Sequence, residues 1–164
     1  MPDAARATRD PAPTAGVSRD NFGFLLAKAS QRWNELLYER FVAAGYPDVR
    51  PSYGSVLVPL YEEDGLRIGE IARRARLSKQ TMTTLVRLVE RERLVERRPD
   101  PSDGRASLVF LAARARAFRG VAERALLELE RAVRAMVPAA RHAELREDLR
   151  RLAEMEMAEE VHGR

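Results

Sequence analysis

The residues best placed to do chemistry lie in the middle of the chain, directly after Ser78. They carry short or polar side chains that donate hydrogen bonds, and base edges in the DNA major groove offer matching acceptors and thymine methyl groups. Ser78 is a good N-cap, and the free N–H groups at the positive end of a helix that starts there suit a phosphate. The pattern indicates a helix that contacts DNA through Lys79, Gln80, Thr81, Thr83, Thr84 and Arg87.

A second group of candidate DNA contacts follows this helix. Arg105 lies in a segment rich in proline, aspartate and glycine, where it can reach a phosphate or a narrow minor groove. Arg97 and Arg98 precede this segment and can line the DNA backbone beside it. Arginine suits these positions because its guanidinium binds phosphates and base edges in a bidentate manner.

Apolar periodicity predicts the elements that position these side chains. Apolar residues recur at helical spacing in residues 67–76 and 79–93, which are separated by only a tight link. Such a pair forms a helix–turn–helix unit, with the first helix packed under the second. The period then falls to two over residues 95–98 and 106–111, which predicts a β-hairpin, or wing, with its loop at 99–105. The stripes expected to meet are Ile68, Ile71, Ala72 and Ala75 on the first helix and Met82, Leu85, Val86 and Val89 on the second.

Longer helices flank this unit. Apolar stripes extend over residues 20–45, over 113–136 and beyond Pro138, and a shorter helix opens at Pro51. Each long stripe exceeds what a compact lobe can cover, so we expect the flanking helices to bury it in a two-fold homodimer. The expected fold class is mostly α with a small β-hairpin wing: a winged helix–turn–helix with N- and C-terminal dimerisation helices.

The same pattern sets the expected organisation of the chain. Residues 1–18 contain three prolines and too few large apolar side chains to order themselves, which predicts a flexible N-terminal tail. Residues 19–164 then form a single winged-helix domain, with a DNA-binding lobe at about 50–112 and dimerisation helices at about 20–45 and 113–160. A dimer would place its two recognition helices about 34–36 Å apart, so a pseudo-palindromic double-stranded DNA site is the expected partner.

Positive charge is concentrated in one central block. Residues 67–119 hold 14 basic and 6 acidic side chains, a balance of +8, whereas the segments before and after this block each carry −2. Such a block attracts phosphate, membrane headgroups or acidic proteins. Because the block is centred on the helix–turn–helix unit, it favours DNA binding. The alternative is a solvated basic face on a unit used only for protein packing.

Composition argues against several other functions. Cysteine is absent, which excludes disulfides and thiolate chemistry, and only His142 and His162 carry an imidazole, so we expect no metal centre. His142 lies near Glu144 and Asp148, and this group is interpreted as solvated surface charge in preference to a metal site or an acid–base pair. Apolar runs fall far short of the roughly 20 residues of a membrane span, and no signal peptide is evident. The expected location is the cytoplasm, with no membrane partner.

No pattern typical of an active site occurs. The chain lacks a nucleophile elbow, a dinucleotide-binding glycine motif and a P-loop, so we expect neither catalysis nor a cofactor. Trp33 and Tyr53 are large aromatics near the junction with the DNA-binding lobe, where they could line a ligand pocket. The alternative for this pair, and the favoured one, is core packing.

Four segments resemble one family of regulators. They are IGEIA at 68–72, LSKQTMTTLV at 77–86, LVERR at 94–98 and DPSDGRA at 100–106. Together they resemble the multiple antibiotic resistance regulator (MarR) family of winged helix–turn–helix transcriptional regulators, over about residues 20–160. The resemblance implies a dimeric transcription factor, usually a repressor, that is often released by a small aromatic or anionic ligand.

The resemblance also implies roles for particular residues. Ser78–Thr84 would face the major groove, and Asp103 would hold Arg105 in place at the wing tip. The sequence departs from the family pattern where Ala112 leaves the next helix without a cap and where Ala115 or Arg116 stands in place of a glycine. It departs again at Arg93, where a glycine commonly ends the recognition helix.

The sequence therefore predicts a sequence-specific DNA-binding regulator, and specifically a homodimeric repressor of a nearby promoter. The competing hypothesis is a non-enzymatic architectural or protein-interaction module that binds nucleic acid without sequence preference.

Overall fold

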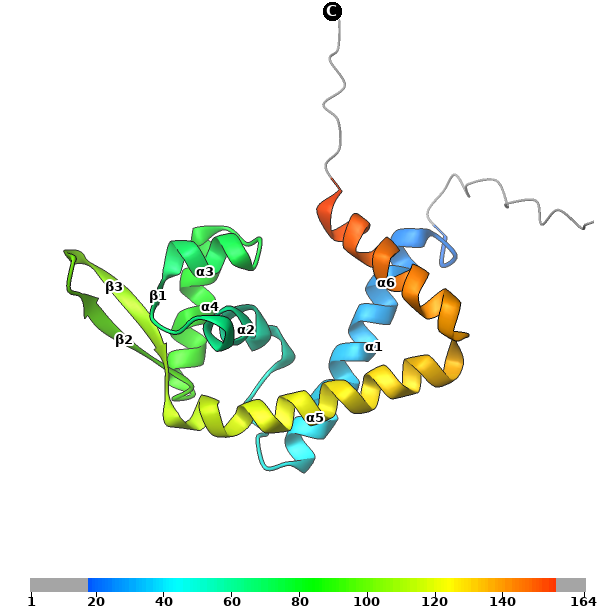
Figure 1. Cartoon of the computed structure of the whole chain (residues 1–164), viewed down its shortest axis with the longest axis horizontal. Coiled ribbons are helices and arrows are strands. Elements are labelled where there is room, and N and C mark those ends of the chain that lie inside the picture. The colour runs from blue at the N-terminus through cyan, green and yellow to red at the C-terminus, as the bar shows by residue number, and fades with distance from the viewer. Residues whose placement is uncertain (1–17, 156–164) are drawn as a thin grey trace, which may run out of the picture.

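The computed structural model describes residues 18–155 and arranges them as a small lobe and a long helical arm (Figure 1). The tail predicted for residues 1–18 lies outside the described residues except for Ser18, as do His162 and the end of the last predicted helix. In chain order the elements are α1 (Phe22–Ala43), the 3₁₀ turn η1 (Pro51–Tyr53), α2 (Gly54–Glu62), β1 (Leu66–Arg67), α3 (Ile68–Arg74), α4 (Lys79–Arg91), β2 (Val95–Asp100), β3 (Asp103–Leu111), α5 (Ala113–Met136) and α6 (Ala139–Glu154).

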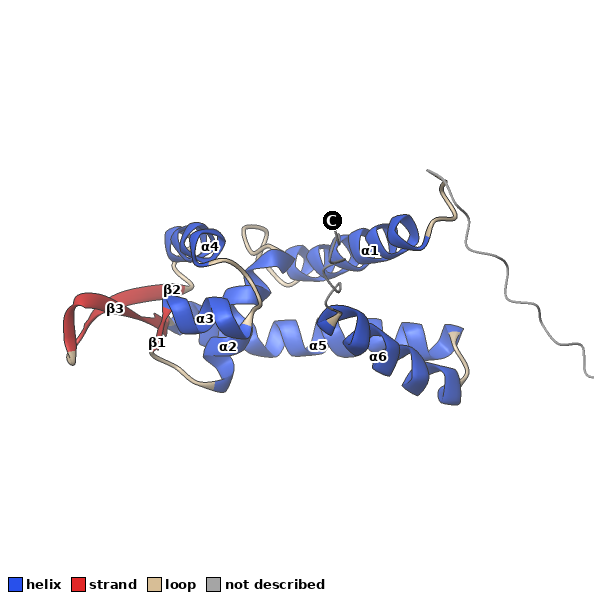
Figure 2. Cartoon of the chain, turned by 90° about the horizontal axis from the view of Figure 1, so that it is seen from above, coloured by secondary structure: helices blue, strands red, loops and turns tan. Residues whose placement is uncertain are grey.

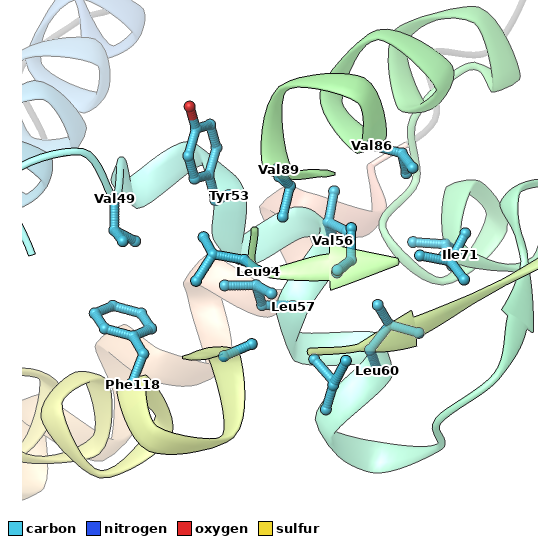
Figure 3. Close-up of a cluster of buried hydrophobic side chains, with 14 of the residues drawn as sticks. Val49, Tyr53, Val56, Leu57, Leu60, Ile71, Val86, Val89, Leu94 and Phe118 are labelled. Atoms are coloured by element: carbon cyan, nitrogen blue, oxygen red, sulfur yellow. The ribbon is translucent and has the colours of Figure 1, made fainter. Parts of the chain in front are cut away.

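The core of the lobe lies where α2, α3 and α4 meet the base of the wing (Figure 3). Met82, Val86 and Val89 on α4 are fully buried, as the apolar spacing predicts. Ile71 on α3 and Leu57 on α2 pack into the same cluster. This burial fixes the rotation of α4 about its axis, because the apolar stripe must face α2 and α3.

Three helices end on a residue in the left-handed conformation. Gly45, Arg76 and Arg93 have φ values of 89°, 52° and 57°. At each end the backbone N–H groups bond back in the Schellman pattern; after α4, the N–H of Leu94 donates to the carbonyl of Val89 at 3.1 Å. Glycine adopts this conformation without steric cost, whereas arginine does not. The departure expected at Arg93 is therefore a site of local backbone strain.

The wing differs from its prediction in two respects. The sheet has three strands in the order β1-β3-β2, because Leu66 and Arg67 pair antiparallel with Val109 and Leu108. A two-residue strand is too short to show a period of two, so the sequence predicted only a hairpin. The strands are also longer than predicted: Pro99 pairs with Ser107, and the turn narrows to residues 101–102. Proline is tolerated at this position because β2 is an edge strand.

The approach of α2 to the wing requires a glycine. Gly65 has φ of 77°, and a Cβ atom there would lie 2.6 Å from the ring of Phe110. Both the backbone conformation and the close ring contact exclude a larger residue. The Asp64–Gly65 pair predicted to stop the second helix therefore also sets the angle at which β1 enters the sheet.

The arm consists of α1, α5 and α6. Figures 1 and 2 show α5 as the longest helix, with the lobe at its N-terminal end and with α1 and α6 toward its other end. Phe41 on α1 packs edge-on against Phe118 on α5, with ring centroids 4.9 Å apart. The N-cap residue of α5 is Ala112, whose side chain cannot accept a capping hydrogen bond, as the departure from the family pattern predicts.

One prediction about the arm is wrong in part: Glu144 and Asp148 are exposed, as expected, but the histidine beside them is not. His142 on α6 is buried, and its Nε2 lies 3.3 Å from Oε1 of Glu130 on α5, so it is not part of a solvated charged surface. The cause is the chain reversal at Pro138, which folds the first turn of α6 against the end of α5. None of the helices within residues 18–155 combines the length and the apolarity needed to cross a membrane.

The strain at Arg93 leads to a stability prediction. Arg93→Gly should raise the free energy of unfolding by about 1 kcal/mol, because glycine relieves the left-handed conformation. The midpoint of thermal unfolding should rise by about 2–4 °C. Arg91→Gly is the matched control: Arg91 lies within helical residues, so glycine there should lower the midpoint. A fall with Arg93→Gly would contradict the strain assigned to this helix end.

Candidate nucleic-acid interface

The outward face of α4 carries the side chains that the sequence analysis selected. Ser78 caps the helix: its Oγ accepts from the backbone N–H of Thr81 at 3.1 Å. Of the side chains predicted to contact DNA from this helix, Thr83 is half-buried and the rest are exposed. This orientation follows directly from the burial of the apolar stripe on the opposite side of the helix. The exposed residues are Ser78, Lys79, Gln80, Thr81, Thr84 and Arg87.

The threonine hydroxyls on this face already donate hydrogen bonds within the helix. Thr83 Oγ1 donates to the carbonyl of Lys79 at 2.7 Å, and Thr84 Oγ1 donates to that of Gln80 at 3.3 Å. Their oxygens can still accept, and their methyl groups remain available for contact with thymine methyls. Within residues 18–155, the side chains of Lys79, Gln80 and Arg87 make no hydrogen bond, so these three are the free donors of the face.

The wing places Arg105 in solvent. Its side chain is exposed, and among the described residues its guanidinium has no hydrogen-bond or ion-pair partner. Asp103 Oδ1 accepts from the backbone N–H of Arg105 at 3.1 Å. The expected contact between these two residues therefore occurs at the main chain, where it shapes the start of β3 and leaves the guanidinium free.

Arg97 and Arg98 lie on opposite faces of β2, because successive residues of a strand alternate. Arg97 faces α4 and pairs with its Glu90, with an N–O distance of 2.7 Å. Arg98 pairs with Glu96 and stacks over the ring of Phe110, 4.6 Å from its centroid. Both arginines thus have partners within the chain, and only Arg97 faces α4.

An interaction that was not predicted from the sequence anchors the wing turn. Asp100 is buried; its Oδ2 accepts from Nε of Arg67 at 2.7 Å, and its Oδ1 accepts from both the backbone N–H and the hydroxyl of Ser102. The hydrogen bonds from Ser102 and Arg67 lower the pKa of Asp100 to about 2. The Asp-Pro-Ser order signals a side-chain-stabilised turn, but the partner Arg67 is 33 residues away and carries no such signal.

The joint between lobe and arm is also polar. Arg114 on α5 donates to the carbonyl of Glu92 and pairs with Asp48, with an N–O distance of 2.7 Å. Tyr61 donates its hydroxyl to the carbonyl of Ala115 at 2.7 Å, and burial raises the pKa of this tyrosine to about 12. These contacts fix the start of α5 against the lobe that presents α4.

Trp33 and Tyr53, the candidate ligand contacts, both pack with the hydrophobic core. Tyr53 is 5% exposed, and Figure 3 shows its hydroxyl pointing out of the cluster of apolar side chains. Trp33 is half-buried and packs against the same core. Core packing thus accounts for the burial of both rings.

Comparison with known proteins agrees with this architecture. The model of the MarR family matches residues 48–106. A probable transcriptional regulator from Pseudomonas aeruginosa is 28% identical with a TM-score of 0.71, covering 81% of this chain and 97% of that one. CouR from Rhodococcus jostii RHA1, bound to p-coumaroyl-CoA, is 26% identical with a TM-score of 0.66, covering 85% and 96%.

A third solved structure shares the fold at lower identity. It is the MepR–DNA complex of S. aureus, 18% identical with a TM-score of 0.70, covering 82% of this chain and 96% of that one. A search of curated proteins found no match. The chain is thus similar to the MarR family of transcriptional regulators over the lobe, and it shares the winged helix–turn–helix fold of the solved regulators over both lobe and arm.

The anchor at Asp100 leads to a prediction about the wing. Asp100→Asn should raise amide hydrogen exchange across residues 97–107 and lower DNA affinity by about 3- to 10-fold, because the charge-assisted bond to Arg67 is lost. Asp103→Asn, which removes the charge from an exposed carboxylate of the same turn, should raise exchange less. Unchanged exchange in Asp100→Asn would show that Arg67 does not hold the turn.

The pH dependence of this anchor has a definite sign. The pKa of Asp100 in the folded protein, about 2, lies below its ordinary value of 3.8. The stabilisation is therefore fully present above pH 4 and is lost as the pH falls toward 2. Wing exchange, corrected for intrinsic rates, should be constant between pH 5 and 8.

Proposed function

We propose that this chain is a cytoplasmic, homodimeric repressor. It binds a specific, pseudo-palindromic DNA site at a nearby promoter. The observation that carries the proposal is the set of free donors on α4, Lys79, Gln80 and Arg87, together with the exposed guanidinium of Arg105, which has no partner among residues 18–155. The fold is shared with MepR, which was solved as a DNA complex, and this supports DNA binding by the present chain.

The recognition helix would supply specificity and the wing would supply affinity. The amide of Gln80 can bond an adenine edge in a bidentate manner, and Thr84, one turn further along, can contact a thymine methyl group. Arg105 would enter the minor groove or contact a phosphate, which fixes position more than sequence. Arg97 faces α4 from β2 and would exchange its pairing with Glu90 for a phosphate only at a cost.

Dimerisation is supported by apolar side chains that one chain leaves exposed. Phe22 and Leu25 on α1 are 62% and 52% exposed, and Leu145 and Leu149 on α6 are 42% and 43% exposed. All four lie on the arm. A second copy related by two-fold symmetry would cover them, since the same patch then serves both subunits. The distance between the two recognition helices would then match one turn of DNA.

A small aromatic or anionic molecule could regulate such a repressor. The structure of CouR contains p-coumaroyl-CoA, an aromatic and anionic compound. In this chain a ligand near Trp33 and Tyr53 would contact the core between α1 and the lobe. The ligand would release the protein from DNA if it bound more tightly to an arrangement of the two lobes that does not fit the DNA site.

Binding to the DNA upstream of the protein's own gene tests the proposal. A footprint should locate a site there, and affinity for it should exceed affinity for random DNA of equal length by about 10³-fold or more. Gln80→Ala should cost about 1–3 kcal/mol on this site and little on random DNA, whereas Arg105→Ala should weaken both. A specific-to-random ratio near one would favour the architectural module.

Sedimentation tests the dimer. Leu145→Glu combined with Leu149→Glu should shift the chain toward monomer, because charge would replace an apolar contact on α6. Val58→Glu is the matched control: Val58 is equally apolar and 53% exposed, but it lies on the lobe, so its variant should remain dimeric. A dimer that tolerates both α6 substitutions would place the interface elsewhere.

A further inference from the structure

The turn of the helix–turn–helix unit makes a long-range contact with the arm. Arg76 lies in this turn, two residues before Ser78, and its Nη1 donates to the carbonyl oxygen of Ala153 at 2.8 Å. Its Nη2 lies 3.3 Å from Oε1 of Glu154. Ala153 and Glu154 end α6, and Figures 1 and 2 both show this end of α6 facing the α3–α4 connection.

The chemistry of this contact suits both partners. The last carbonyls of a helix have no partner within it and carry the negative end of its dipole, so a cation there is stabilising. Arg76 supplies two donors on one planar group, which allows it to bond the Ala153 carbonyl and the Glu154 carboxylate together. The guanidinium therefore acts as a C-terminal cap for α6 provided by the DNA-binding lobe.

The backbone that carries this guanidinium is itself fixed. The N–H of Arg76 donates to the carbonyl of Arg73 at 3.2 Å, and the N–H of Leu77 donates to that of Ala72 at 3.0 Å. These bonds join the turn to α3, and the capping bond of Ser78 joins it to α4. A force applied at Arg76 therefore acts directly on the start of the recognition helix.

Arg76 adds a third place where the lobe is held by the arm. The first is the start of α5, where Arg114 and Tyr61 make the joint described above, and the second is α1, whose Tyr38 donates to the carbonyl of Pro47 and packs under Arg50. Within residues 18–155, every hydrogen bond or ion pair between α6 and the lobe involves Arg76. The first two attachments lie where α5 and α1 meet the lobe, so a third one, made by the far end of α6, restricts rotation of the lobe about them.

We propose that Arg76 is a positioning residue that sets the angle between the recognition helix and the dimer arm, and thereby the half-site spacing that the protein accepts. This inference rests on the proposed function, since spacing has meaning only for a dimer on a two-part site. Both side chains of the ion pair are more than half exposed, at 60% and 64%, so the pair contributes little to folding. The pair acts instead on the orientation of the recognition helix relative to the arm.

A pair of matched glycine variants tests this role. Arg76→Gly keeps the left-handed backbone and removes the guanidinium. Arg93→Gly makes the same change at the equivalent end of α4, where the described residues offer the side chain no contact with the arm. Each protein is titrated against duplexes whose half-site spacing is that of the footprinted site, or differs by one or two base pairs, and against a duplex with a single half-site.

Arg76→Gly should lose about 3- to 10-fold in affinity at the natural spacing and should discriminate less among the others. Its affinity for the single half-site should be unchanged, its unfolding midpoint should not fall, and Arg93→Gly should match the wild type on every duplex. Glu154→Arg places a repelling charge on the arm opposite Arg76 and should flatten the spacing profile in the same way.

Two outcomes would overturn the role assigned to Arg76. A wild-type spacing profile in both Arg76→Gly and Glu154→Arg would show that the contact does not set orientation. An equal loss on the single half-site would show that the guanidinium contacts DNA phosphate directly. Failure of the proposed function is distinct from both, because the wild-type protein would then prefer no site and no spacing.

Discussion

The burial of one apolar stripe on α4 is the constraint on which the rest of the structure depends. Met82, Val86 and Val89 must face α2 and α3, and this leaves a single face of a 13-residue helix in solvent. Turning the helix by about 100°, one residue's step, would bury Gln80 and expose part of the stripe. The cost of exposing those side chains, about 1.5–3 kcal/mol each, keeps the donor face outward.

The polar contacts around the lobe have a different purpose. The bonds of Asp100 with Arg67 and of Arg114 with Asp48 bury little apolar area, yet each joins segments far apart in the chain. Hydrophobic packing determines which faces meet, but it is non-directional. Charge-assisted hydrogen bonds are directional, so they determine the angles at which the wing and the arm leave the packed lobe.

The helices could be predicted from the sequence because their determinants are local. The apolar period, the Ser78 cap and the break at Pro138 lie within a few residues of the boundaries that they set, and the predicted 113–136 coincides with α5. Strand β1, the partner of Asp100 and the burial of His142 could not be predicted, because each depends on a contact between distant segments. The donor face of α4 belongs to the first kind: it is one side of one helix. The residues that orient this face belong to the second.

The uncapped start of α5 has a consequence for how the molecule unfolds. No side chain of its own cap holds the first turn; it is held instead by Tyr61, which bonds the Ala115 carbonyl, and by Arg116, which bonds Asp64. Further along, Phe118 packs with the aromatic rings of α1 and the following loop. Helix α5 therefore packs against both the lobe and the arm, and neither of them alone supplies all of its stabilising contacts. Lobe and arm should therefore lose structure as a single cooperative unit, without a folded winged helix that outlives its arm.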